Sequence, residues 1–175
     1  MQKYRVTLTG LTSAKITVYE KSMVGYVEFM GSCLYFDKDG MVVESSKEHY
    51  GSVPKVTGLQ MDYIVLNQKL PVVDDVIFQE LLQMTQYFSS TMITFGDMES
   101  DMISLVDGIH FDSHENVSCT IGDIEISFGS GEQMEGKLQE MHDILPKLYG
   151  RKGTLHLETY DETVTKPSYV FRNRE

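Results

Sequence analysis

The chain of 175 residues can form one ordinary domain with a core of its own, and its hydrophobic share of 41% is typical of a folded protein. Its formal net charge of −11 argues against a general nucleic-acid-binding protein, because clustered Lys and Arg are needed to hold a phosphate backbone. No run of about 18 apolar residues occurs, so we expect no membrane span within the chain. Residues 1–20 are polar and alternating, unlike a signal peptide, and a strand pattern begins almost at once. We therefore expect the chain to be part of a longer protein.

Acidic residues are concentrated in the middle of the chain. No Lys or Arg occurs between Lys69 and Lys137, whereas 13 Asp and Glu residues lie between these two positions. A solvated acidic face that keeps the domain soluble is the favoured interpretation. The alternative is a docking face for a basic partner.

The first part of the chain predicts β structure. YRVTLTG (4–10) and AKITVYEK (14–21) alternate as strands do, and GYVEFMGSCLYFDKDGMVVESS (25–46) contains two strand-like runs. Asp37-Lys38-Asp39-Gly40 joins these two runs as a hairpin turn, because Gly accepts the positive φ that closes such a turn. A loop follows at 49–59. Cys33 and Cys119 both lie in strand-like runs, and we expect buried free thiols.

Two amphipathic helices are predicted, at about 74–89 and about 132–148. Asp74 is a candidate N-cap for the first helix, with an apolar stripe behind it. In the second helix Pro146 lacks a backbone donor and should kink or end the final turn. The apolar positions of this helix fall on one face: Met134, Leu138, Met141, Leu145 and Leu148.

The remaining segments again predict strands. MITFG, MISLVDGIHF, VSCTIG and DIEISFG lie between 92 and 129, with a five-residue turn at 112–116. GTLHLETYDETV (153–164) and SYVFR (168–172) form the last two runs. The class is therefore α+β, with a mostly antiparallel or mixed β-sheet and two main amphipathic helices.

The segment Gly131-Glu-Gln-Met-Glu-Gly-Lys137-Leu138 nearly matches the phosphate-binding loop G-x-x-x-x-G-K-[ST], between a strand and a helix. Leu138 cannot ligate magnesium where Ser or Thr must, and Glu132 and Glu135 would face triphosphate charge. The same two acids suit the first turn of a helix. Nucleotide binding is thus the least favoured interpretation.

No other pattern predicts chemistry. His110 and His114 stand four apart across a strand and its turn, where they need not face the same way. Gly129-Ser130-Gly131 is too short for a nucleophile elbow, and both cysteines lie in apolar runs that disfavour a thiolate. We predict no catalytic, cofactor-binding or metal-binding residues, and no enzyme activity.

Several segments, in the same order, resemble the FtsQ/DivIB family of bacterial cell-division proteins. KITVYEKSMVGYV resembles the strand that leaves the small POTRA domain of the family, YFDKDGMVV resembles its hairpin and VPKVTGL its P-x-(L/I/V)-x-G loop. DIEISFG, GKLQEMHDIL and GTLHLETYD resemble the closing strand, helix and strand. The resemblance covers roughly residues 14–171, although 92–116 carry no matching signature.

The resemblance implies a domain organisation and a role. Residues 1–24 would be the end of a POTRA-like domain, and residues 25–175 the β domain of the family. The native protein would be a single-pass cell-membrane protein, anchored through a helix absent from this chain, with this part extracytoplasmic at the division septum. It would act as a non-enzymatic divisome scaffold that binds FtsB/DivIC-like and FtsL-like coiled-coil partners, and no nucleic acid. A POTRA-like export or assembly module is the alternative.

The family contact uses the last strands of the β domain, where a partner segment adds to the sheet. A sheet edge offers unpaired amides and carbonyls that such a segment can satisfy. The corresponding residues here are Leu157, Thr159, Tyr160, Tyr169, Val170 and Phe171. The alternative for the aromatic residues among them is that they simply close the core.

Overall fold

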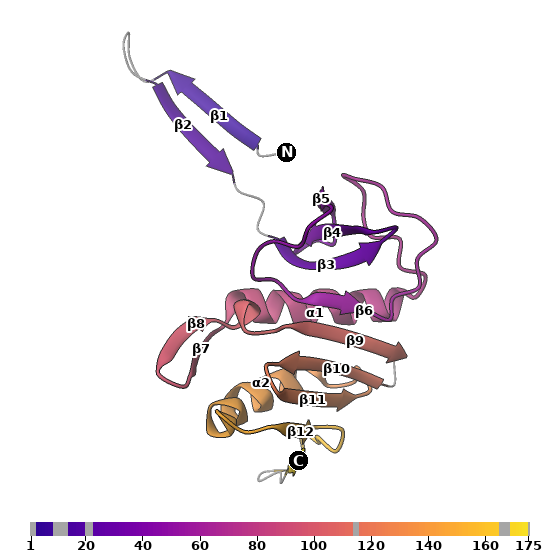
Figure 1. Cartoon of the computed structure of the whole chain (residues 1–175), viewed down its shortest axis with the longest axis vertical. Coiled ribbons are helices and arrows are strands. Elements are labelled where there is room, and N and C mark those ends of the chain that lie inside the picture. Colours follow the sequence, from indigo (N-terminus) through magenta and orange to yellow (C-terminus); the bar gives the residue numbers. More distant parts are fainter. Residues whose placement is uncertain (1–2, 9–13, 20–22, 114–115, 165–168, 175) are drawn as a thin grey trace.

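A computed structural model describes residues 3–8, 14–19, 23–113, 116–164 and 169–174. The chain is a mixed α+β protein, which confirms the predicted fold class (Figure 1). Its elements in order are β1 (Lys3–Leu8), β2 (Ala14–Tyr19), β3 (Met23–Phe29), β4 (Ser32–Asp37), β5 (Val42–Ser46), β6 (Lys55–Thr57), α1 (Asp75–Ser90), β7 (Met92–Phe95), β8 (Met98–Asp101), the 3-10 turn η1 (Met102–Ser104), β9 (Gly108–Ser113), β10 (Asn116–Ile121), β11 (Ile124–Gly129), α2 (Met134–Ile144), the 3-10 turn η2 (Leu145–Leu148), β12 (Gly153–His156) and β13 (Val170–Asn173).

One nine-stranded sheet organises the fold, in the order β13-β12-β11-β10-β9-β6-β3-β4-β5. Most neighbours are antiparallel, but β11 with β12, β3 with β6 and β6 with β9 are parallel. The parallel pair β11 and β12 follows from the crossover through α2. Strands β1 with β2 and β7 with β8 form two further antiparallel pairs.

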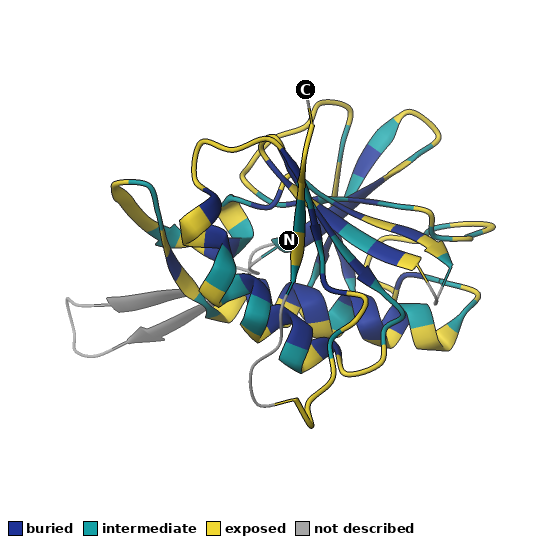
Figure 2. Ribbon diagram, turned by 90° about the horizontal axis from the view of Figure 1, so that it is seen from below, coloured by how far each residue is buried: buried dark blue, intermediate teal, exposed yellow. Residues whose placement is uncertain are grey.

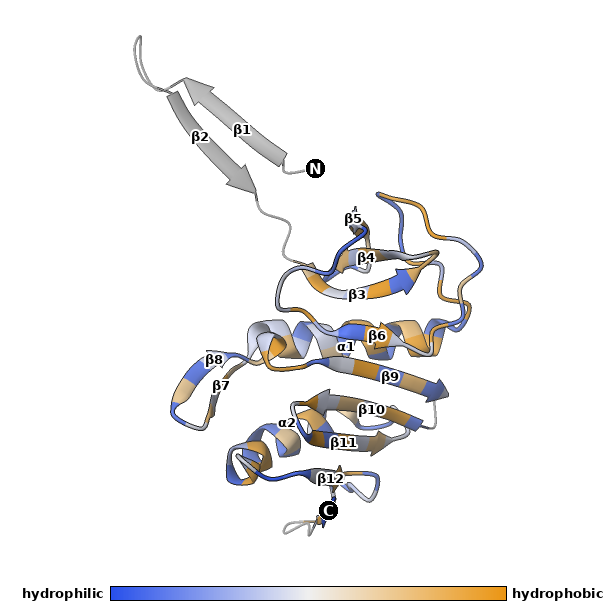
Figure 3. Cartoon of the chain, viewed as in Figure 1, coloured by the Kyte–Doolittle hydropathy of each residue, from blue (hydrophilic) through white to orange (hydrophobic). Residues whose placement is uncertain are grey.

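Both helices cover the same face of this sheet and contact each other, and their buried residues face the strands (Figure 2). Leu81 and Phe88 of α1, Leu138 of α2 and Ile126 and Phe128 of β11 are fully buried in the resulting core. Burying each such side chain contributes roughly 1.5–3 kcal/mol. Hydrophobic residues recur along β9, β10 and β11 at the centre of the sheet (Figure 3). The opposite face of the sheet is called the open face below.

A second, smaller core lies on the other side of β3, β4 and β5. Tyr26, Cys33, Tyr35 and Val43 are buried there. The hydroxyl of Tyr35 accepts a hydrogen bond of 2.8 Å from the Tyr50 amide, so the loop after β5 closes over this cluster. The open face is therefore covered at one end and polar at the other.

The start of α1 agrees with the prediction, whereas the second predicted helix, about 132–148, is divided into α2 (Met134–Ile144) and the 3-10 turn η2. The Asp74 carboxylate accepts hydrogen bonds from the amides of Val76 (2.8 Å) and Ile77 (3.2 Å), as an N-cap does. Pro146 stands in the first turn of η2, where the α-helix has given way to a 3-10 turn. The prediction for Pro146 is therefore confirmed.

Some strand predictions were wrong. The run before the Asp37 turn contains a further hairpin turn at Met30-Gly31, where both residues have positive φ. The apolar residues 102–104 form η1 rather than a strand, because Met102 turns into the core. Strand β12 ends at His156, before the run of alternating residues does. Strands β9 and β10 take in most of the expected turn at 112–116, and His114 lies outside the described residues.

The predicted boundary after residue 24 falls inside β3, which belongs to the nine-stranded sheet. The division into a POTRA-like remnant and a β domain stays a prediction. Among the described residues, neither helix has the length and hydropathy required to cross a membrane.

Candidate functional site

The sheet has two outer strands, and they differ in how far their edges are covered. On β5, the amide of Val42 donates to the carbonyl of Gln68 (2.8 Å) and its carbonyl accepts from the amide of Asn67 (2.7 Å). Within the described residues, no strand pairs with the outer side of β13. The edge at β13 is therefore the better candidate for strand addition.

The register of β13 determines which of its backbone groups face outward. Thr154 pairs with Arg172 and His156 with Val170, and the Arg174 amide donates to the Lys152 carbonyl at 3.0 Å. Hydrogen-bonded pairs alternate along an antiparallel ladder, so Arg172 and Val170 bond inward to β12. The amides and carbonyls of Phe171 and Asn173 therefore face outward.

The side chains of β13 alternate between the two faces of the sheet. Val170 is 54% exposed and lies beside His156 on the open face, together with Arg172. Phe171 lies beside Leu155 on the helix face, partly buried against the main core. The Arg151 guanidinium stands 4.6 Å from the centre of the Phe171 ring. This cation–π contact restrains Phe171.

Basic residues gather around this edge although the chain as a whole is acidic. Arg174 forms an ion pair with Glu125 (2.6 Å), and Lys152 forms one with Asp123 (3.0 Å). Arg172 is exposed, and no ion pair joins it to a described residue. The edge therefore presents positive charge that is only partly balanced.

The other predicted docking residues pack within the molecule or stand apart from β13. Leu157 is fully buried, and its amide donates to the Ser127 carbonyl at 2.8 Å. Thr159 is exposed in the turn after β12. The Tyr160 ring lies directly against Gly136 of α2. Only Val170 and Phe171 of the six lie on the edge strand itself.

Tyr169 precedes β13 and packs against the main core. Burial, together with the nearby Glu140 carboxylate and Tyr160, raises the pKa of its hydroxyl to about 12. The hydroxyl oxygen is buried, and no described atom completes a hydrogen bond of good geometry to it. Tyr160 thus packs on α2 and Tyr169 packs on the main core directly before β13, which places the start of the edge strand.

The loop that resembles a phosphate-binding loop uses its lysine internally. The Lys137 ammonium is buried and donates to the Ser130 carbonyl at 2.7 Å. Burial lowers the pKa of Lys137, and the negative charges of Glu132, Glu158 and Glu80 oppose that shift. An ammonium engaged in this way does not face an incoming phosphate.

Both cysteines lie buried in strands, as predicted. Burial raises the pKa of the Cys119 thiol well above its ordinary value, which disfavours the thiolate. Among the residues that the structure describes, no group of three His, Cys, Asp or Glu side chains could hold a metal ion.

No protein-family model matches the chain, and no curated protein matches its sequence.

Proposed function

We propose that this chain is the extracytoplasmic docking domain of a non-enzymatic divisome scaffold of the FtsQ/DivIB type. The native protein is anchored in the cell membrane by a single helix outside this chain and acts at the division septum. An extended segment of an FtsB/DivIC-like partner adds to the sheet at β13, with an FtsL-like protein in the same complex. The open outer edge of β13 is the observation that carries this proposal.

The backbone of β13 supplies the affinity. Phe171 and Asn173 each present one outward donor and one outward acceptor, which a partner strand satisfies in register. Each hydrogen bond contributes about 0.5–1.5 kcal/mol net. Because Tyr169, directly before β13, packs against the main core, little ordering of β13 is required on binding.

The side chains of β13 supply the specificity. Val170 and Arg172 line the open face next to the added strand, and Arg172 has no ion pair with a described residue. An acidic residue of the partner would pair with Arg172, and an apolar one would cover Val170. On the open face, the partner segment is therefore expected to carry one acidic residue and one apolar residue, two positions apart in its sequence.

Coexpression with the FtsB/DivIC-like and FtsL-like proteins of the same organism tests the proposal. Asn173→Pro removes one outward amide and no backbone hydrogen bond of the sheet, so the complex should be lost from size-exclusion chromatography while thermal unfolding changes only as much as in the Asn173→Ala control. Asn173→Ala is the matched control, because it also removes the hydrogen bond from Arg151 to the Asn173 side chain (2.9 Å) but keeps the amide. A complex that survives Asn173→Pro intact contradicts the proposal.

A further inference from the structure

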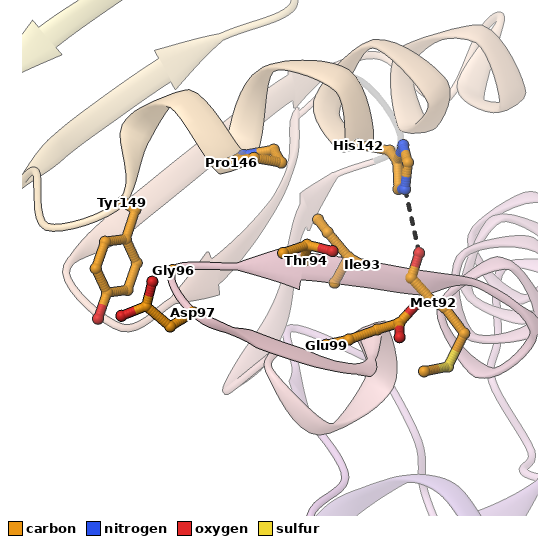
Figure 4. Close-up of a pocket in the computed structure, with 9 residues that line it drawn as sticks. All are labelled: Met92, Ile93, Thr94, Gly96, Asp97, Glu99, His142, Pro146 and Tyr149. Carbon is orange, nitrogen blue, oxygen red and sulfur yellow. Dashed lines mark hydrogen bonds between the residues drawn. The ribbon is translucent and has the colours of Figure 1, made fainter.

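A groove of about 610 Å³ lies between the β7–β8 hairpin and the segment formed by the end of α2 and η2 (Figure 4). The hairpin and the helical segment come from parts of the chain about fifty residues apart, and the groove belongs to neither alone. It is lined by Met92, Ile93, Thr94, Gly96, Asp97, Glu99, His142, Pro146 and Tyr149.

The two walls of the groove are joined at both ends. At one end the Tyr149 ring lies on Gly96, where no side chain stands in its way, and meets Phe95 edge-on with ring centres 5.2 Å apart. At the other end the Nε2–H of His142 donates a hydrogen bond of 3.2 Å to the Met92 carbonyl. The groove therefore exists before any ligand arrives.

Apolar side chains are exposed around the groove. Tyr149 is 60% exposed and Met92 is 49% exposed. These two large apolar side chains stand at the two ends of the groove, and a partner lying along the groove would bury both favourably. Methionine in particular adapts its shape to the segment that it contacts.

The groove is also negatively charged. Asp97 and Glu99 line it, and no ion pair joins either carboxylate to a described residue. The hairpin also carries Asp101 and no Lys or Arg, and on the helical side Asp143 stands beside His142. Lys147 of η2 is the one Lys or Arg in the segments 92–101 and 142–149 that form the groove.

We propose that this groove docks a basic, partly apolar segment of another protein. One Lys or Arg side chain of that segment stacks on the Tyr149 ring beside the Asp97 carboxylate, and a second one pairs with Glu99 near the Met92 end of the groove (Figure 4). An apolar residue of the segment covers Met92. The site is separate from the β13 edge, and neither depends on the other.

The binding of a short fluorescein-labelled peptide of alternating Lys and Leu to the whole chain tests this proposal by fluorescence anisotropy. The double variant Asp97→Asn/Glu99→Gln should weaken binding about tenfold. It removes two partly exposed ion pairs and the carboxylate beside the cation that stacks on Tyr149. Glu44→Gln/Glu48→Gln removes the same charge from exposed positions at and after β5 and should change binding less than about twofold.

Two results would overturn the proposal. One is that the peptide does not bind, or that the two double variants weaken its binding equally. Equal weakening would mean that only the net charge of the protein attracts the peptide. The other is that spermine at an equal concentration displaces the peptide, and that spermine binding responds to the two double variants in the same way as peptide binding. That result would assign the groove to polyamines.

Discussion

The Tyr160 ring and the Gly136 backbone are in direct contact, and a Cβ atom at position 136 would overlap the phenol. Gly136 lies within α2, where glycine is otherwise unfavourable by roughly 1 kcal/mol relative to alanine. The contact therefore explains a residue that helix propensity disfavours. It also holds the chain that leads from β12 toward β13.

Gly136→Ala should have opposite effects in two backgrounds. With Tyr160 present, the added methyl displaces the ring and lowers the free energy of unfolding. In a Tyr160→Ala background the same change should raise it by up to about 1 kcal/mol, because only the helix propensity remains. Urea unfolding of the four proteins measures both effects. Equal effects in the two backgrounds would show that the contact is unimportant.

Leu157→Ala should destabilise the fold rather than act on binding alone. Its side chain is fully buried in the main core, so its removal should lower the free energy of unfolding by about 2–5 kcal/mol. Thr159→Ala, at an exposed position two residues on, is the control and should change it by less than about 0.5 kcal/mol. Chemical denaturation compares them, and similar values would contradict the placement of Leu157.

The acid stability of the protein should depend on Glu158. Burial alone would raise its pKa, but hydrogen bonds from Ser127 and His156 outweigh burial and lower it. A lowered folded-state pKa stabilises the fold above the ordinary value of about 4.3, and this contribution is lost as pH falls through the lower folded value. Glu158→Gln should therefore flatten the loss of stability in acid. Replacing the exposed Glu162 by Gln should leave the loss of stability in acid unchanged. Identical acid profiles for the two variants would rule out the role of Glu158 in acid stability.

Tyr169 should limit stability in alkali. Its folded-state pKa of about 12 exceeds the ordinary value of about 10, so its contribution is complete below pH 10 and is lost as pH rises toward 12. Tyr169→Phe should reduce this alkaline loss. At neutral pH it should cost less than about 0.5 kcal/mol, because the hydroxyl has no hydrogen bond of good geometry to a described atom. Thermal unfolding between pH 9 and 11.5 provides the comparison, and a steeper decline for the variant would refute it.

Local signals predicted the parts of the fold that local interactions determine. Asp74 caps α1 through its own neighbours, and the Asp37 carboxylate accepts hydrogen bonds from the amides of Asp39 and Met41 in the predicted turn. The turn at Met30-Gly31 was missed because apolar residues flank it on both sides and resemble one continuous strand.

The candidate site was predicted only in part, because tertiary contacts decide it. Alternation continues past His156, but the chain leaves the sheet there and Tyr160 packs on Gly136 of a distant helix. The same alternation does not reveal which edge of the sheet is open. The edge of β5 is bonded to the backbone of Asn67 and Gln68, and no pattern in the sequence predicts these hydrogen bonds.

Photo-crosslinking from the edge strand in living cells tests the central claim most directly. A photoreactive phenylalanine at position 173 lies on the edge strand, next to the proposed partner strand, and the same residue at the 90% exposed position 30 is the control. The account predicts that position 173, and not position 30, crosslinks to single-pass coiled-coil membrane proteins identified by mass spectrometry. Crosslinks from both positions alike, or none to such proteins from position 173, would contradict it.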